Sequence, residues 1–242
     1  TTKLEYKSDI EGILIKSRDY EEEISIINYS KKLNNWADFI IGSCDYFNRF
    51  YKIDIKNVVV NIDSELPIGI GLSSSAATCV SMIRALSNLF EINLDESTTV
   101  KIAHWIENDF VGVGGGIMDQ FVSVYGEIDK ALFLNTNNND YKLIPLFNDY
   151  SFQIIDSGKK RILSDSAFND RKKMCNKSAE KMSLQYLCDK DKIGEEDKNL
   201  LSASEFKVSK HVIEENIRSK KGLEALLNND PKLFGELMTQ SH

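Results

Sequence analysis

The sequence lacks the features that mark several large classes of protein. Its 37 Asp and Glu outnumber its 30 Lys and Arg, the net charge is −7, and its basic clusters, at residues 159–161 and 171–173, are short. This balance argues against a nucleic-acid-binding protein, which usually has a basic face. No apolar run is long enough to cross a bilayer, and the polar residues 1–12 contain no signal-peptide core. We therefore expect neither a nucleic-acid nor a membrane partner.

Metal-binding and disulfide patterns are also missing. The four cysteines lie far apart, between positions 44 and 188, and form no C-x-x-C pair. The three histidines, at positions 104, 211 and 242, are equally scattered. Neither a zinc site nor a disulfide framework is indicated. Free thiols in a reducing cytosol are the simplest interpretation, so we expect a cytoplasmic protein.

The order of the expected elements predicts the fold class. The 242 residues suffice for one large domain or two small ones. Short strands dominate the first part of the chain, and charged helices dominate from residue 165 onward. Strands early and helices late favour an α+β fold over a doubly wound parallel sheet. We place a domain boundary near residue 147, which gives domains of residues 1–147 and 148–242.

Hydrophobic spacing and turn residues assign the individual elements. We expect an antiparallel pair of strands within residues 11–30, and further strands at 57–63, 130–135 and 150–156. We expect helices at 34–52, 76–90 and 97–109, and three more within 164–182, 207–229 and 230–242.

A cluster of small residues, "LPIGIGLSSSAATCV" at positions 66–80, joins an expected strand to an expected helix. Gly69 and Gly71 permit backbone conformations that other residues avoid and allow close approach to a ligand. The serines that follow can cap the helix, and its free N–H groups and dipole attract anions. Hydroxyl groups in this position can also bind phosphate oxygens or a hard cation such as Mg²⁺. The pattern therefore indicates a phosphate-binding loop.

Two other interpretations of this loop remain open from the residues alone, a turn without ligand and a dinucleotide site, and a third, the Walker A loop, is excluded. Small residues also suit a tight strand-to-helix turn that has no ligand. A Walker A loop would need a Gly-Lys-Ser/Thr ending, and no lysine is present. A dinucleotide fingerprint, with Ser74 as the third small residue and Glu91 as the distant acid, fits poorly because of the three serines. An NAD-dependent oxidoreductase is accordingly a weak alternative.

The loop and three further segments resemble one known family. "PIGIGLSSSAA" at 67–77 is similar to the phosphate-binding motif of the galactokinase, homoserine, mevalonate and phosphomevalonate kinase superfamily. "GIMDQF" at 116–121, "SDSAFNDRKKMC" at 164–175 and the helical segments between 211 and 242 resemble the galactokinase branch. These pieces occur in the expected order over most of the chain.

The resemblance implies a fold of two α+β lobes with the active site between them, and transfer of the ATP γ-phosphoryl group to a sugar hydroxyl. It implies that Asp119 is the catalytic base, which agrees with the ability of a carboxylate to orient and deprotonate a hydroxyl. It implies Mg²⁺ binding by Ser75 and Glu107, and sugar binding by Asp119, Gly116 and Phe168. The implied ATP-binding residues are Gly69, Ile70, Gly71, Leu72, Ser73, Ser74, Ser75 and Trp36.

Some family features are absent from the sequence. The branch has an N-terminal "P-G-R-V-N-L-I-G-E-H-x-D-Y" motif and a C-terminal "G-x-G-F-G-G" motif, and we expect that this chain represents the middle of such a kinase. Phe168 stands where a tyrosine is usual, and Asn135 where an aspartate is common. Arg161 adds a basic side chain that suits an acidic sugar. The expected reaction is formation of galactose 1-phosphate. The alternatives are a kinase for galacturonate or N-acetylgalactosamine, and a kinase-like sensor of sugar and ATP that acts through a partner.

Overall fold

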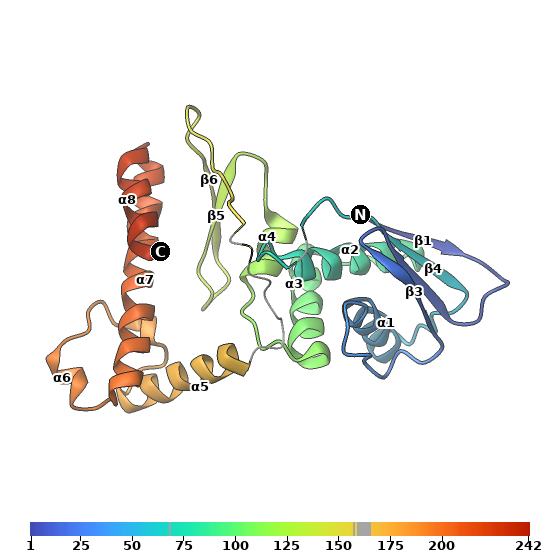
Figure 1. Ribbon diagram of the computed structural model, residues 1–242, viewed down its shortest axis with the longest axis horizontal. Coiled ribbons are helices and arrows are strands. Elements are labelled where there is room, and N and C mark those ends of the chain that lie inside the picture. The colour runs from blue at the N-terminus through green and yellow to red at the C-terminus, as the bar shows by residue number, and fades with distance from the viewer. Residues whose placement is uncertain (68, 157, 159–165) are drawn as a thin grey trace. The chain divides into compact units, whose positions relative to one another are not determined.

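The structure is a computed structural model that describes all residues except 68, 157 and 159–165, together with all side chains except those and residues 166–168. The chain divides into two compact units (Figure 1). The first unit contains Thr1–Gly126 and a short return segment that begins at Ile155. The second contains Glu127–Ile154 and the helices from Ser166 onward. The boundary expected near residue 147 stays a prediction.

A four-stranded mixed sheet organises the first unit. Its strands are β1 (Thr2–Tyr6), β2 (Ile13–Ser17), β3 (Tyr20–Ile26) and β4 (Val58–Ile62), in the order β1-β4-β2-β3. The expected hairpin is confirmed, because β2 and β3 pair antiparallel, with Ile13 opposite Ile26. The expected buried strand at 57–63 is also confirmed: β4 lies between β1, its antiparallel neighbour, and β2, its parallel neighbour.

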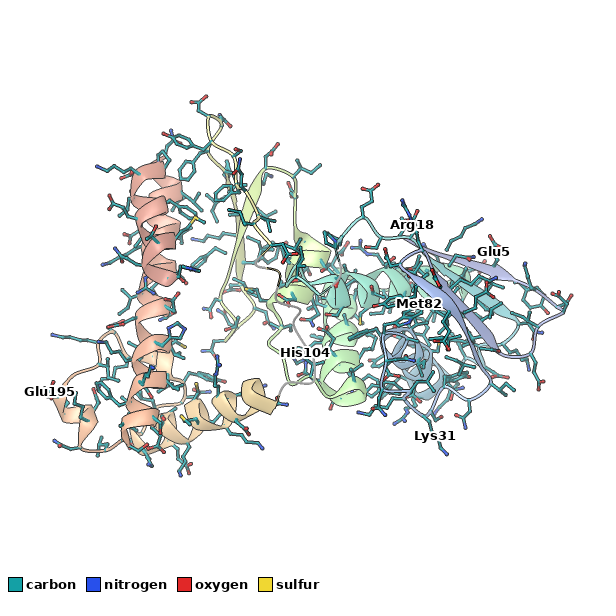
Figure 2. The ribbon with its side chains drawn as sticks, in the orientation of Figure 1. Glu5, Arg18, Lys31, Met82, His104 and Glu195 are labelled. Atoms are coloured by element: carbon teal, nitrogen blue, oxygen red, sulfur yellow. The ribbon has the colours of Figure 1, made fainter. Side chains whose placement is uncertain are left out.

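Helices complete this unit. They are α1 (Asp38–Tyr51), α2 (Ser74–Leu89), α3 (Glu96–Trp105), the π-helix η1 (Ile106–Val111) and α4 (Met118–Tyr125). Alternate strand residues such as Ile15, Ile24 and Val60 share one core with apolar residues of α1, α2 and α3. Met82 of α2 is fully enclosed in this core (Figure 2). The α+β class is thereby confirmed, and the first helices follow the expected spacing.

The second unit combines a hairpin with helices. The hairpin strands are β5 (Lys130–Leu134) and β6 (Tyr141–Pro145). The helical elements are α5 (Ser166–Lys181), the 3-10 turn η2 (Leu187–Asp189), α6 (Glu195–Lys198), α7 (Ala203–Leu227) and α8 (Pro231–Ser241). The expected strand at 150–156 is wrong: its described residues form no ladder, although Phe152 packs edge-on against Phe234 of α8. A strand requires a neighbouring strand for its backbone hydrogen bonds. In the described part of the chain residues 150–156 have no such neighbour, and β5 and β6 pair only with each other.

None of the helices, as far as the structure describes them, combines the length and apolar character needed to span a membrane. The four cysteines are free thiols.

Glu205 lies in the first turn of α7 as the acidic member of a capping box. Its backbone N–H donates to the Ser202 hydroxyl at 3.3 Å, and its carboxylate accepts from the Ser202 N–H at 2.8 Å. The Lys181 ammonium donates to both carboxylate oxygens, at 2.9 and 2.7 Å, and lies on α5. The hydrogen bond from Lys181, followed by those from Ser202, lowers the pKa of Glu205 to about 2. One carboxylate thus caps α7 and ties it to α5.

We predict that Glu205→Gln lowers the melting temperature of the second unit by several degrees at pH 7. Because the pKa is lowered on folding, the stabilisation is complete above the ordinary value of 4.5 and is lost as the pH falls toward about 2. The difference between the variant and the wild type should therefore shrink below pH 4.5 and vanish only as the pH approaches about 2. Thermal melting followed by circular dichroism, with hydrogen exchange of α7 peptides, measures this. The matched control is Glu214→Gln, because exposed Glu214 has only a 3.7 Å ion pair with Lys210. Equal effects of the two variants would contradict the prediction.

Candidate active site

The glycine-serine loop leads from β4 into α2 in an unusual backbone conformation. Gly69, Gly71 and Ser73 have φ angles of +77°, +83° and +53°, all in the left-handed region. A Cβ atom added at Gly69 or Gly71 would meet no atom within 4 Å, so these glycines are required by the backbone angle and not by packing. The loop therefore presents open backbone at the start of a helix.

The first turn of α2 is suited to an anion. Within the described chain, no side chain caps its N-terminus and no acidic residue occupies its first turn. The N–H groups of this turn have no partners inside the helix, and the dipole favours negative charge there. Ile70, Leu72, Ser74 and Ser75 are half-buried, so the loop is accessible but supported. An open helix start of this kind suits phosphate, as the sequence predicted, whereas the expected capping by the serines is not found in the described structure.

A cavity of about 690 Å³ adjoins the loop within the first unit. Its lining includes Gly71, Leu72 and Ser73 of the loop and Val122 and Ser123 of α4. One face of α2 and the first residues of β1 complete it. The loop and α4 therefore border the same space.

Trp36 lies just before α1 and not within it, because α1 begins at Asp38. Its indole stacks on the ring of Tyr20, with centroids 4.5 Å apart and planes 1° from parallel. Both residues are half-buried, and burial raises the pKa of the Tyr20 hydroxyl. The stack fixes the plane of the indole, and contact between Trp36 and a nucleotide stays a prediction.

A π-helical turn positions Glu107. The carbonyl of Glu107 accepts hydrogen bonds from the N–H groups of Gly112 and Val113, at 3.0 and 2.9 Å, which widens the end of α3 into η1. π-turns of this kind occur frequently at functional sites. The turn packs closely on α1, since a Cβ atom added at Gly42 would lie within 3.0 Å of the side chains of Ile106 and Phe110. As a result, Glu107 is only 7% exposed.

Three side chains, from α2 and α4, act on Glu107 of η1. Gln120 of α4 donates a side-chain hydrogen bond to its carboxylate. Burial raises the pKa of Glu107, hydrogen bonds from Ser75 and Gln120 lower it, and the charge of Asp119 raises it further. The structure thus brings together Ser75, Glu107 and Asp119, the three residues to which the family resemblance gave metal-binding and catalytic roles. Figure 1 shows α2 and α4 beside α3, the helix that η1 and Glu107 continue.

Cys79 of α2 lies within electrostatic range of Glu107. Its thiol is fully buried, and burial together with the charge of Glu107 raises its pKa well above the ordinary value. A thiol held neutral in this way adds no charge beside the carboxylates.

Asp119 lies in the first turn of α4 and is half-buried. The glycine-rich segment before it has left-handed residues at Gly112 and Gly114, with φ of +88° and +73°. Gly116 is exposed, and a Cβ atom there would meet nothing within 4 Å. The carboxylate therefore stands at the end of an open backbone turn, within electrostatic range of Glu107.

The donor set fits a Mg²⁺ ion that arrives with a nucleotide. In the described ranges, no group of three or more His, Cys, Asp or Glu residues could hold a metal without other ligands. Mg²⁺ is usually bound by one or two carboxylates together with substrate phosphates and water. The site offers one hydroxyl, of Ser75, and one buried carboxylate, of Glu107, beside a loop suited to an anion. This is the kind of ligand set that Mg²⁺ uses.

Two features of the site are absent from the sequence prediction. Gln120 was part of a recognised segment but had no role, and Tyr20, which begins β3, fell between the two expected strands and was not singled out. The side chain of Phe168, a predicted sugar contact, lies outside the described residues, as does Arg161.

Asn135 follows β5 and shapes the hairpin turn: its side-chain oxygen accepts from the Asn137 N–H at 3.0 Å. An aspartate carboxylate could accept the same hydrogen bond, so the structure does not explain the departure from aspartate at this position.

Comparison with known proteins points to one family. Residues 38–127 match the family model described as "GHMP kinases N terminal domain". The chain is 40% identical over 217 residues to galactokinase of Thermotoga maritima, covering 88% of this chain and 60% of that protein. It is 38% identical over 229 residues to galactokinase of Thermosipho africanus, covering 93% and 63%. The chain thus spans about 60% of the length of the curated relatives it matches.

Solved structures agree with this result. The crystal structure of Lactococcus lactis galactokinase complexed with galactose matches with a TM-score of 0.88 and 26% identity. The match covers all of this chain and 65% of the other. A D-glycero-D-manno-heptose 1-phosphate kinase from Bacteroides thetaiotaomicron shares the fold, with a TM-score of 0.60 and 17% identity.

Proposed function

Because the chain belongs to the galactokinase branch of the GHMP kinase superfamily, we propose that it phosphorylates a sugar with ATP, and that the sugar is galactose. The observation that carries this proposal is the convergence of Ser75, Glu107 and Asp119 beside the glycine-serine loop. Phosphoryl transfer depends mainly on positioning and on neutralising charge, and these residues supply both. In this proposal the first unit, which holds the loop and these three residues, supplies the phosphate-binding and catalytic groups of a kinase.

Each residue has a stated task in the reaction. The loop from Gly69 to Ser75 binds the phosphate oxygens through backbone N–H groups, and Trp36 contacts the nucleotide. Ser75 and Glu107 hold Mg²⁺, which offsets the charge of the phosphates when it is bound. Asp119 accepts the proton of the sugar hydroxyl as the oxygen forms its bond to the γ-phosphorus. The bond between that phosphorus and the bridging oxygen breaks, so ADP leaves and galactose 1-phosphate forms.

The names of the relatives support galactose as the substrate, and the free cysteines support the compartment. The curated relatives are named galactokinases, and the solved relative contains galactose. Galacturonate remains a competing substrate because the basic Arg161 suits an acidic sugar, and N-acetylgalactosamine remains a further alternative. The four free cysteines favour a reducing compartment such as the cytosol.

We predict sugar-dependent release of ADP from Mg²⁺-ATP, with turnover on D-galactose exceeding that on N-acetylgalactosamine and galacturonate. A coupled assay with the three sugars side by side, and a control without sugar, measures this. Turnover on another sugar alone would replace galactose as the substrate. Binding of sugar and ATP without ADP formation, together with ligand-dependent capture of a regulator, would favour the sensor. Stabilisation by NAD or NADP and not by Mg²⁺-ATP would favour the oxidoreductase.

A further inference from the structure

Gln120 is the buried amide that links α4 to the π-turn. Its side chain is 1% exposed, and its Nε2 donates to Oε2 of Glu107 across 13 residues of sequence. Among the described residues its Oε1 has no hydrogen-bond partner. A buried amide with one unpaired oxygen costs stability that an apolar side chain would not cost. This cost suggests that the amide is required for something other than packing.

The orientation of the amide follows from chemistry. An ionised carboxylate only accepts hydrogen bonds, so the NH₂ group of Gln120 must face it. This hydrogen bond occupies one oxygen of Glu107 and fixes the rotation of the carboxylate. An acidic residue at position 120 would instead add negative charge beside Glu107 and Asp119, whose charges already repel each other. Glutamine provides a donor without a charge.

The position of Gln120 in the sequence strengthens the argument. It directly follows Asp119 in the first turn of α4, a helix that packs against both α2 and α3. One helical turn therefore carries the carboxylate assigned to the sugar and the amide that holds the carboxylate assigned to the metal. Groups that orient a metal ligand commonly affect metal affinity by 10- to 100-fold.

We propose that Gln120 is a positioning residue: its side-chain amide holds the Glu107 carboxylate in the orientation in which it binds the divalent cation of the nucleotide. This inference rests on the proposed function, because it assumes that Glu107 is a Mg²⁺ ligand. Gln120 itself touches neither nucleotide nor sugar in this proposal. Its effect is on the metal, and the binding of metal-free nucleotide should not depend on it.

The test measures metal binding directly. Mn²⁺ is titrated into the protein with saturating ADP and followed by electron paramagnetic resonance, and ADP binding in EDTA is measured separately by calorimetry. Gln120→Met keeps the volume but removes the donor, and we expect it to weaken Mn²⁺ about 10- to 100-fold without changing ADP binding in EDTA. Gln120→Asn keeps the amide but is one methylene too short, and should show a loss in the same direction. The control is Gln153→Met, at an exposed glutamine of the second unit.

A double-variant cycle separates positioning from structural support. In a Glu107→Gln background, Gln120→Met should cause no further loss of Mn²⁺ affinity, because the carboxylate that it orients is gone. A lowered melting temperature with unchanged Mn²⁺ affinity would overturn the proposal, as would an equal loss in both backgrounds. If Gln120→Met fails to fold, Gln120→Asn decides between these outcomes.

The outcomes also distinguish this inference from the proposed function. Wild-type protein that binds Mn²⁺-ADP but releases no ADP with any sugar would refute the sugar-kinase reaction and leave the role of Gln120 decided by its variants. Wild-type protein that binds no Mn²⁺-ADP would overturn the role of Gln120, whatever the turnover.

Discussion

Replacing Asp119 by asparagine is expected to lower kcat for sugar phosphorylation by about 10²- to 10⁴-fold, the usual contribution of a general base. Asparagine keeps the size of the side chain and its place in the first turn of α4, but it cannot accept the hydroxyl proton. Because Asp119 faces the sugar in the proposed reaction, the affinity for Mg²⁺-ADP should be unchanged. Removing its charge also relieves the repulsion that raises the pKa of Glu107.

The measurements are steady-state kinetics with galactose and calorimetric titration with Mg²⁺-ADP. Asp109→Asn is the matched control, because Asp109 is an exposed carboxylate on the π-turn. It should retain wild-type turnover. If Asp119→Asn turns over at the wild-type rate, Asp119 is not the base. If it loses Mg²⁺-ADP binding instead, Asp119 belongs to the metal site.

The conformation of the glycine-serine loop was largely predictable from sequence because its signals are local. Glycines before a run of serines, between an apolar strand and an amphipathic helix, permit few conformations, and Gly69 and Gly71 have the positive φ angles expected. The left-handed angle of Ser73 was not predictable, since serine rarely adopts it. The roles of Glu107 and Asp119 came from family resemblance, and the structure adds their proximity.

The π-turn and the amide of Gln120 could not be derived from sequence. The spacing of residues 97–109 predicts a continuous helix, and the change to π-helix at Ile106 depends on tertiary packing against α1 at Gly42. Gln120 has an ordinary residue type whose role becomes visible only when Glu107 is placed beside it. Contacts between residues distant in sequence leave no local pattern.

Errors in the strand predictions have a similar cause. β1 has a mostly polar sequence, and its place is set by backbone pairing with β4, with Leu4 opposite Val60. Residues 150–156 alternate as a strand should, yet the described part of this segment pairs with no other strand. Strand formation is decided by the partner, and alternation alone describes only one side of the pair.

Phe47→Ala is expected to destabilise the first unit by about 3–5 kcal/mol, out of the 5–15 kcal/mol typical of a folded domain. Phe47 has no exposed surface and belongs to the core shared by the sheet, α1 and α2. Its ring also packs against Tyr51, with centroids 5.3 Å apart. Truncation removes this contact and leaves a cavity that α1 cannot close without losing its own packing on η1. Because η1 carries Glu107, the loss should extend to the candidate site.

Tryptophan fluorescence during urea unfolding measures this effect in the first unit alone. The two tryptophans of the sequence, Trp36 and Trp105, both lie in that unit and pack against its core. Phe50→Ala is the matched control: Phe50 lies on the same helix, is 57% exposed, and contacts Tyr46 and Trp105 only at the rim of the core. We expect it to cost about 1 kcal/mol, the usual size of an aromatic pair contact. Equal costs for the two variants would mean that α1 does not pack on the sheet through Phe47, and the placement of η1 and Glu107 would then need another support.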